Sequence, residues 1–257
     1  MILTINHGSV RELRLNRPPA NALSPDLIAA LKQAVERAPQ EGAQALVLSG
    51  SPEFFSGGLD VPLLLKLDRS AMNRVWQDFY ELLRTLACCS VPMAAAITGH
   101  APAGGTVLAL FCDYRIAAQG DWKIGLNEVQ VGLPLPPVIY AALERLVGPR
   151  HAALLAIGGM LVPPSKALEL GLMDEIAPAE RVVERAVEWC REWLALPSVA
   201  LGLTRRQARA DLVAAFGPDV SREVEEISGW WWNEQVQSVL HSLVERLEKR
   251  RQPKAAH

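Results

Sequence analysis

Two glycine-containing loops have the residue types that could stabilise negative charge on an oxygen atom. The loops are residues 55–60, FSGGLD, and residues 101–105, APAGG, and each follows an apolar run. Glycine lets a ligand approach the backbone closely, and the first N–H groups of a helix have no partner within that helix. Two such loops can point two N–H groups at one oxygen and so form an oxyanion hole. Glycines that serve only tight turns and close helix packing are the alternative interpretation.

One isolated carboxylate could act as a base. Glu128 is the only acidic residue between Asp121 and Glu144, and it lies in the largely apolar segment 125–133, GLNEVQVGL. Burial disfavours the charged form of a carboxylate, which moves its pKa towards the range that suits a general base. A carboxylate that points to solvent or pairs with an arginine is the alternative. Motifs for a phosphate loop, a dinucleotide-binding turn and a serine-hydrolase elbow do not occur in the sequence.

The segments that must position these residues alternate between strand and helix patterns. Alternating strands and helices indicate an α/β core with parallel strands. We place this core at residues 1–195 and a helical C-terminal region at 196–257. Strands are expected at 2–6 and 10–15 (a hairpin), 45–48, 91–97, 114–117 and 173–176. Helices are expected from Ser24, an N-cap before Pro25, to about Arg37, from Asp68, at 106–111, 137–147, 149–157 and 164–170, and throughout the chain after Pro178.

Composition and charge exclude several classes of protein. The chain has 257 residues, half of them hydrophobic, and 26 basic against 28 acidic residues give a net charge of −2. No basic excess is available for nucleic acid, and no apolar run reaches the ~20 residues of a membrane span. The first residues show no secretory signal, so a soluble, cytoplasmic protein is expected. Four cysteines without a CxxC pair and five scattered histidines indicate that there is no metal site.

Four motifs together resemble the crotonase, or enoyl-CoA hydratase/isomerase, superfamily. They are NRP and NAL at 16–18 and 21–23, FSGGLD, PAGG and GLNEVQVGL, and they occur in the family's order over about residues 1–180. The segments 102–116 and 124–132 are most similar to mitochondrial-type 3,2-trans-enoyl-CoA isomerases. The resemblance implies an α/β superhelix of stacked ββα turns, whose helical C-terminal region serves in trimerisation or as a lid. It also implies an acyl-CoA thioester substrate, no separate cofactor, and a homotrimer or a dimer of trimers.

The resemblance assigns roles to individual positions. It gives the oxyanion-hole N–H groups to Leu59 and Gly104 and the acid/base role to Glu128. Hydratases of the family carry a second glutamate three residues after the oxyanion glycine, where this sequence has Val107. Asp60 is expected to brace its loop, and residues 61–67 and Trp76 border the acyl tunnel or simply pack in the core. The substrate-binding set that the resemblance implies is Arg17, Ala20, Ala22, Ser56, Gly57, Gly58, Leu59, Asp60, Gly104 and Asn127.

The expected activity is therefore the movement of a 3-enoyl-CoA double bond to the 2-position by a single glutamate. Hydration, decarboxylation or thioester hydrolysis on the same scaffold are alternatives, as is a non-catalytic acyl-CoA-binding protein. The consecutive tryptophans Trp230, Trp231 and Trp232 cannot share one helix face, so at least one of them should be exposed or in a subunit contact.

Overall fold

The larger of two β-sheets organises the N-terminal part of the molecule. The computed structural model describes residues 1–217 and 219–251. Six strands lie in the order β1-β2-β3-β5-β7-β10, with β1 and β2 antiparallel and the other neighbours parallel. The expected hairpin and the expected parallel core are therefore confirmed. The strands are β1 (Ile2–His7), β2 (Val10–Leu15), β3 (Ala45–Ser49), β5 (Met93–Ile97), β7 (Tyr114–Ala118) and β10 (Glu175–Ala177).

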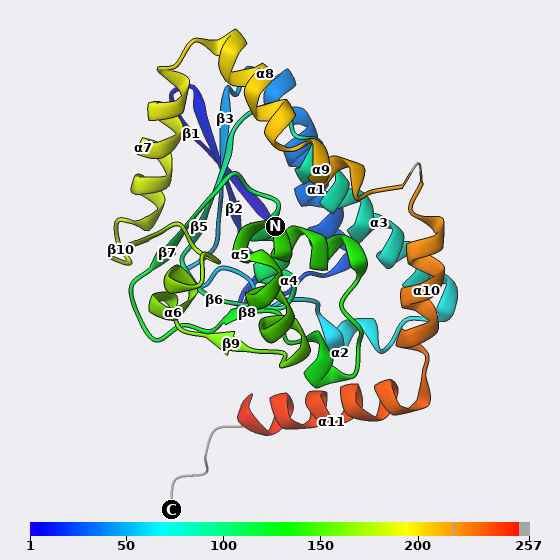
Figure 1. Cartoon of the computed structure of the whole chain (residues 1–257). Helices are drawn as coiled ribbons and strands as arrows, with labels where there is room; N and C mark the ends of the chain where they lie inside the picture. The colour runs from blue at the N-terminus through cyan, green and yellow to red at the C-terminus, as the bar shows by residue number, and fades with distance from the viewer. Residues whose placement is uncertain (218, 252–257) are drawn as a thin grey trace, which may run out of the picture.

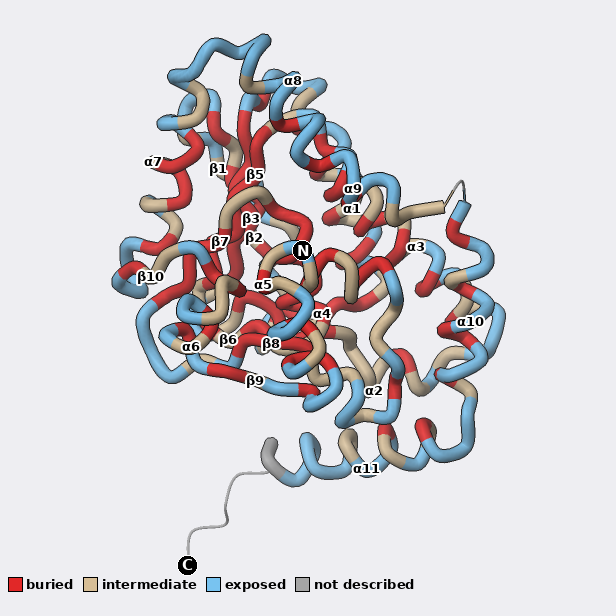
Figure 2. Tube along the Cα trace, in the orientation of Figure 1, coloured by how far each residue is buried: buried red, intermediate tan, exposed pale blue. Residues whose placement is uncertain are grey.

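Helices cover both faces of this sheet (Figure 1). α7 (Val182–Leu194) packs on β3, β5 and β7, and α1 (Pro25–Gln40) packs on the opposite face beneath α3 (Arg69–Cys88). Side chains alternate between these faces along a strand. In β3, for example, Ala45 and Val47 join the cluster under α7, whereas Leu46 and Leu48 join the main core. The buried centre is visible in Figure 2.

A second, smaller sheet carries the chemically interesting loops. It consists of four short strands in the order β4-β6-β8-β9, of which β8 and β9 are antiparallel. The sequence patterns did not predict these strands, because strands of two to four residues are too short to show alternation. They are β4 (Glu53–Phe54), β6 (Gly99–Pro102), β8 (Ile124–Gly125) and β9 (Leu161–Val162).

Helices follow the strands of both sheets. The expected N-cap is present, since the Ser24 hydroxyl accepts a hydrogen bond from Leu27 N–H. At Asp68, where the next helix was expected to start, the carboxylate likewise accepts one from Ala71 N–H. The expected break between two helices at 147–149 is a kink at Gly148, where φ is 72°. The connecting helices are α2 (Val61–Leu64), α4 (Gly104–Leu110), the 3₁₀ helix η1 (Glu128–Val131), α5 (Pro137–Ile157) and α6 (Pro164–Glu169).

The strand expected at 173–176 is displaced along the chain. β10 begins at Glu175, because Asp174 is engaged by Arg115. The Asp174 carboxylate accepts a hydrogen bond from Arg115 N–H at 2.8 Å and pairs with the Arg115 guanidinium at 2.6 Å. These contacts hold Asp174 in the loop before the strand.

The C-terminal helices are anchored to the core through one buried carboxylate. Asp113 pairs with Arg205 and Arg209, each at 2.8 Å, and these two arginines also donate to backbone carbonyls of the core. Five helices run from α7 to the end of the described chain, as expected, but the run from 220 to 250 is broken near Asn233. The remaining helices are α8 (Ser198–Ala208), α9 (Ala210–Ala214), α10 (Ser221–Trp231) and α11 (Glu234–Arg251).

The last helix lies along one side of the molecule and contacts α2, η1 and α10 (Figure 1). Much of its surface is exposed (Figure 2). Within residues 1–217 and 219–251, no helix is long and apolar enough to cross a membrane.

Candidate active site

The two glycine-containing loops lie directly against each other. β4 leads into the first loop and β6 into the second, and these strands are parallel neighbours. A Cβ atom on Gly104 would lie 3.2 Å from the Cα of Gly58, and a Cβ on Gly58 would lie 3.2 Å from the Cβ of Ala103. Gly58 also has a φ of 83°, which favours glycine. Both glycines are therefore needed for the close approach of the two backbones.

Two backbone N–H groups are left without partners where the loops meet. Leu23 N–H donates to the carbonyl of Gly58 at 2.8 Å, and the carbonyl of Leu23 accepts from Asp60 N–H at 3.1 Å. These two bonds flank Leu59, whose own N–H has no partner in the described part of the chain. The N–H of Gly104, the first residue of α4, is likewise unpartnered among those residues. Both residues line the same cavity, so the pair has the components of an oxyanion hole.

Ala103 orients the peptide group that carries the Gly104 N–H. Its φ of 47° and ψ of −119° are values that glycine adopts far more readily than alanine. Ala103 N–H donates to the carbonyl of Gly125 at 2.8 Å, and its carbonyl accepts from Val107 N–H at 2.9 Å. Such a backbone costs ~1–3 kcal/mol and persists only where its surroundings hold it. Here the bonds to β8 and α4 hold it from both sides.

A buried asparagine braces the first loop from behind. Asn21 is fully buried, and its amide nitrogen donates to the carbonyls of Phe54 and Phe55 at 3.0 and 3.2 Å. Ser56 is also fully buried; its hydroxyl donates to the Asn21 carbonyl at 2.8 Å and accepts from Gly58 N–H at 3.2 Å. The two side chains fix the backbone that leads into Leu59.

Asp60 caps and ties down the residues after Leu59. Its carboxylate accepts a hydrogen bond from Leu63 N–H at 3.2 Å, which begins α2, and pairs with Arg17 at 2.6 Å. Arg17 also donates to the carbonyl of Ala22 at 3.1 Å. The sequence-based expectation that Asp60 braces its loop is thus confirmed.

Glu128 approaches the same place from the smaller sheet. β8 pairs with β6, and the chain then enters η1, whose first residue is Glu128. One carboxylate oxygen, Oε2, is buried and has no hydrogen-bond partner in the described structure. Burial raises the pKa of Glu128 to about 7. The carboxylate is largely shielded from solvent and pairs with no arginine among the residues whose side chains are described, so the general-base interpretation is the better supported one.

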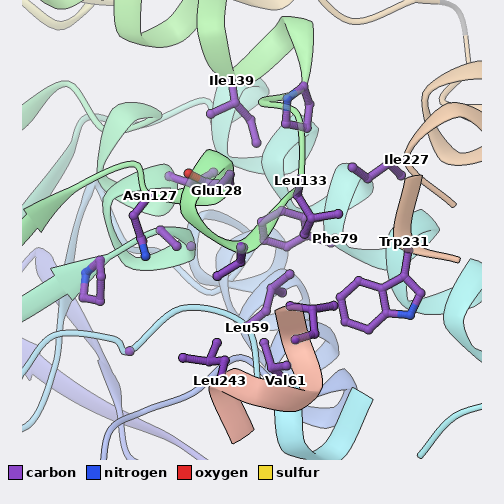
Figure 3. A pocket seen from close by; sticks show the side chains of 18 of the residues that line it. Leu59, Val61, Phe79, Asn127, Glu128, Leu133, Ile139, Ile227, Trp231 and Leu243 are labelled. Atoms are coloured by element: carbon purple, nitrogen blue, oxygen red, sulfur yellow. The ribbon is translucent and has the colours of Figure 1, made fainter. Parts of the chain in front are cut away.

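A cavity of about 240 Å³ connects Glu128, Leu59 and Gly104 and continues between apolar side chains (Figure 3). Val107 is buried in its wall, at the position where hydratases of the resembling family have a second glutamate. Among its lining residues, Glu128 is the only carboxylate. The lining comes from α2, α3, α5, α10 and α11 as well as the loops and includes Val61, Trp76, Phe79, Ile139, Ile227, Trp231, Leu240, Leu243 and Leu247.

The structure brings some of the expected site residues to the cavity and leaves others outside it. Gly57, Leu59, Gly104, Asn127 and Glu128 line it, and Asn127 Oδ1 is a second buried oxygen without a partner among the residues described. Behind this lining lie the other expected residues. Ala20 accepts from Gly57 N–H at 2.7 Å, and the contacts given above place Arg17, Ala22, Ser56, Gly58 and Asp60 in the same support.

Sequence reasoning found part of the apolar lining and missed the rest. Residues 61–67 and Trp76 were expected either to border the acyl tunnel or to pack in the core. Of these residues, Val61, Pro62 and Trp76 line the cavity. A lid was one of the two roles expected for the C-terminal region, but the sequence does not predict which residues of α10 and α11 line the cavity, because that depends on where two late helices dock. Of the three consecutive tryptophans, Trp231 is fully buried in the cavity wall and Trp230 is 45% exposed, so the expected exposure of one of them is confirmed.

Comparison with known proteins gives matches over nearly the whole chain. The family model described as enoyl-CoA hydratase/isomerase matches residues 6–251. The human mitochondrial enoyl-CoA delta isomerase 1 is 29% identical over 245 residues, which cover 94% of this chain and 81% of that protein. A probable enoyl-CoA hydratase of Mycobacterium avium (strain 104) is 33% identical over 205 residues, which cover 79% of this chain and 78% of that protein.

The fold is similar as well. The crystal structure of human mitochondrial delta3-delta2-enoyl-CoA isomerase superposes with a TM-score of 0.93 at 29% identity and covers 97% of this chain and 99% of that one. This likeness confirms the expected α/β fold with its helical C-terminal region.

Proposed function

The chain belongs to the enoyl-CoA hydratase/isomerase family, and we propose that within this family it is an isomerase that moves the double bond of a 3-enoyl-CoA to the 2-position. The expected crotonase resemblance is thereby confirmed. The observation that carries the narrower proposal is the combination of one carboxylate, Glu128, with an apolar side chain at Val107 in a cavity that is also lined by two residues whose backbone N–H groups have no partner in the described part of the chain.

The oxyanion hole acts on the thioester carbonyl. Its oxygen accepts hydrogen bonds from Leu59 N–H and Gly104 N–H, which stabilise the negative charge that develops there. When the α-proton leaves, the electron pair of its C–H bond forms the enolate double bond and the carbonyl electrons move to oxygen. Because these donors are fixed by the backbone before substrate binds, they need no reorganisation as the charge develops. Removing one such donor typically costs ~2.7–4 kcal/mol of transition-state stabilisation.

Glu128 moves the proton. In its ionised form it takes the α-proton, and the resulting dienolate has its double bonds conjugated with the thioester oxygen. The protonated Glu128 then returns the proton to the γ-carbon, so that the remaining double bond lies between the α- and β-carbons. Atoms and charge balance without a cofactor. A pKa near 7 suits both halves of this transfer, because the carboxylate is readily ionised at neutral pH and is still basic.

Hydration would require more than this site offers. Adding water to a double bond needs groups that orient the water and exchange protons with it, and hydratases of the family use two carboxylates for this. Val107 can neither ionise nor hold a water molecule. The proposal is therefore an isomerase that hydrates 2-enoyl-CoA poorly.

The CoA part of the substrate is proposed to run along the braced loops. Gly57 lines the cavity next to Leu59, with Arg17, Ala20 and Ala22 in the support beside it, and Asn127 Oδ1 is buried with no partner in the residues described. Cytoplasmic location stays a prediction; the human relative named above is mitochondrial.

We also propose that the protein assembles as a homotrimer or a dimer of trimers. Large apolar side chains are exposed on α5 and α8, among them Ile157 at 76%, Val199 at 75% and Leu203 at 55%. Contact with a second copy would remove this surface from water. The molar mass in solution tests this assembly.

A side-by-side rate measurement tests the proposed reaction. The wild-type protein is expected to convert a 3-enoyl-CoA into its 2-enoyl isomer at least about a hundredfold faster than it hydrates the 2-enoyl-CoA, the low end of what a positioned acid/base contributes. The conjugated thioester formed in the first reaction and consumed in the second absorbs in the ultraviolet, so one spectrophotometer follows both. Hydration as fast as isomerisation would contradict the proposal, and Val107→Glu then shows whether a second carboxylate raises hydration further.

A further inference from the structure

A pair of tryptophans, Trp76 and Trp231, lines the cavity, and Trp231 lies on the side away from Glu128. In Figure 3, Asn127 and Glu128 lie on one side, Ile227 and Trp231 lie on the other, and Phe79 and Leu133 lie between them. We propose that Trp231, backed by Trp76, sets the upper limit on the length of the acyl chain. The inference rests on the proposed function in taking the occupant of the cavity to be an acyl-CoA.

Two helices build this end wall together. Trp76 on α3 and Trp231 on α10 meet edge to face, with ring centroids 5.8 Å apart and an angle of 76° between the ring planes. Trp76 is 3% exposed and Trp231 is fully buried. Figure 3 shows the benzene ring of Trp231 directed towards Leu59 and Phe79, with its indole nitrogen on the far side. The face presented to a chain in the cavity is therefore hydrocarbon.

A second layer of polar contacts stands behind the wall. One helical turn earlier on each helix, the Ser228 hydroxyl donates to the amide oxygen of Asn73 at 2.5 Å. Beyond this bond an open groove runs between α3 and α10, and its lining includes the polar side chains Arg69, Arg74 and Gln77. A chain that passed the tryptophans would have to part this hydrogen bond and would emerge among charged and polar groups.

These surroundings predict a sharp dependence on chain length. Each methylene group that leaves water for the cavity strengthens binding by about fourfold. The gain ends where the chain meets Trp231, because protein interiors are close-packed and the indole has no empty space to move into. The cavity has a volume of about 240 Å³, which it shares between the oxyanion loops and the apolar end, so the space for the acyl chain is limited. Medium-length acyl chains are the class expected to fit.

Trp230 provides a matched control. It is the preceding residue on α10 and has the same side chain, but it is 45% exposed and does not line the cavity. Removal of its indole changes the tryptophan content of the helix by the same amount without opening the wall.

The experiment measures the binding of saturated acyl-CoAs, which cannot react, to the wild-type protein, Trp231→Ala, Trp231→Leu and Trp230→Ala. Dissociation constants are obtained by calorimetry for butanoyl-, octanoyl-, dodecanoyl- and hexadecanoyl-CoA. The wild type is expected to bind octanoyl-CoA most tightly. Trp231→Ala should shift the ratio of hexadecanoyl to octanoyl affinity by about tenfold or more towards the longer chain, Trp231→Leu should shift it less, and Trp230→Ala should leave it unchanged.

Two outcomes would overturn the proposal. One is a wild type that binds hexadecanoyl-CoA as tightly as octanoyl-CoA. The other is a folded Trp231 variant, judged by its melting curve, that keeps the wild-type profile; Trp231→Leu serves here if Trp231→Ala does not fold. Rates with 3-enoyl-CoAs of matching lengths separate this inference from the reaction. If the binding profile shifts but neither the wild type nor any variant isomerises these substrates, the proposed isomerase activity is refuted. The proposal that Trp231 limits the chain length is then still supported.

Discussion

The first hairpin and the active-site cavity each hold a glutamate with a buried carboxylate oxygen, and the two carboxylates have opposite surroundings. Glu12, on β2, is fully buried and accepts hydrogen bonds from Ser49 at 2.6 Å, Arg14 at 2.8 Å and His7 at 3.0 Å. Burial alone would raise the pKa of Glu12, but these partners hold it below its ordinary value. Glu128 has a buried oxygen without a partner, and burial raises its pKa to about 7.

The difference shows how one residue type serves structure in one place and chemistry in another. A carboxylate whose lone pairs are occupied by protein donors is held in its charged form and has no free lone pair for a substrate proton. A carboxylate that is buried without donors is a stronger base and keeps its lone pairs available. Burial by itself therefore does not identify a catalytic acid; the number of donors around it does.

The largest expected effect that separates the two glutamates is on catalysis. Glu128→Gln should lower the rate of 3-enoyl-CoA isomerisation by ~10³-fold or more while the protein still binds acyl-CoA, because an amide cannot take the α-proton. Glu12→Gln should keep the wild-type kcat. Rates at saturating substrate, with acyl-CoA affinity measured separately, make this test. Comparable losses of kcat in folded Glu128→Gln and Glu12→Gln would contradict the assignment of a catalytic role to Glu128 and a structural role to Glu12.

A smaller effect, of opposite sign at the two positions, is expected on stability. The pKa of Glu128 in the folded chain, about 7, lies above its ordinary value of 4.5, so its burial destabilises the fold as pH rises from about 4.5 to 7 and does so fully above 7. Glu128→Gln should therefore raise the free energy of unfolding at pH 8 by up to about 3 kcal/mol and have little effect below pH 4.

Glu12→Gln should do the reverse. It leaves donors without their charged acceptor and should lower the free energy of unfolding at pH 8 by at least about 2 kcal/mol. Because the pKa of Glu12 is lowered, its stabilisation is present above the ordinary value and is lost as pH falls through the lowered one. Urea unfolding of both variants at pH 8 and pH 4 checks the two signs, and equal signs at pH 8 would contradict the assignment of donors given above.

The smallest effect is on the pH profile. The free enzyme must have Glu128 ionised, so kcat/KM should rise about tenfold between pH 6 and pH 8, with a midpoint near the pKa of about 7. The folded Glu12→Gln variant should show the same midpoint. A wild-type profile that is flat between pH 6 and pH 8 would mean that the pKa of Glu128 lies outside this range or that proton removal does not limit kcat/KM.

Local chemistry in the sequence was sufficient for many elements of the fold. Ser24 and Asp68 mark helix starts because a side-chain oxygen beside unpartnered N–H groups is a local requirement, and both caps are found. Glu128 is identifiable as an isolated carboxylate in an apolar segment. The glycines of the two loops suggest an oxyanion hole, but tight turns explain them equally well, and only the family resemblance favoured the first interpretation, since a glycine alone does not reveal what approaches it.

Other parts depend on contacts between distant segments. The two-residue strand Glu53–Phe54 is defined by its partner Gly99–Pro102, and nothing in two residues shows a period. The sequence does not distinguish Trp231 from its two neighbouring tryptophans. Its place in the cavity wall depends on the packing of α10 against α3. Asn21 belongs to a recognised motif, but its role as a brace appears only when its partners Phe54 and Phe55, more than thirty residues away, are in place.

At the backbone of Ala103, thermal stability and catalytic rate have opposite requirements. Its φ of 47° and ψ of −119° are maintained by bonds to two other elements, so the fold as a whole carries the strain of one peptide. A lineage selected only for heat resistance would gain by relaxing that peptide, and the Gly104 N–H would turn away with it. Selection for thermal stability at this peptide would therefore lower the catalytic rate, because it would remove an oxyanion donor.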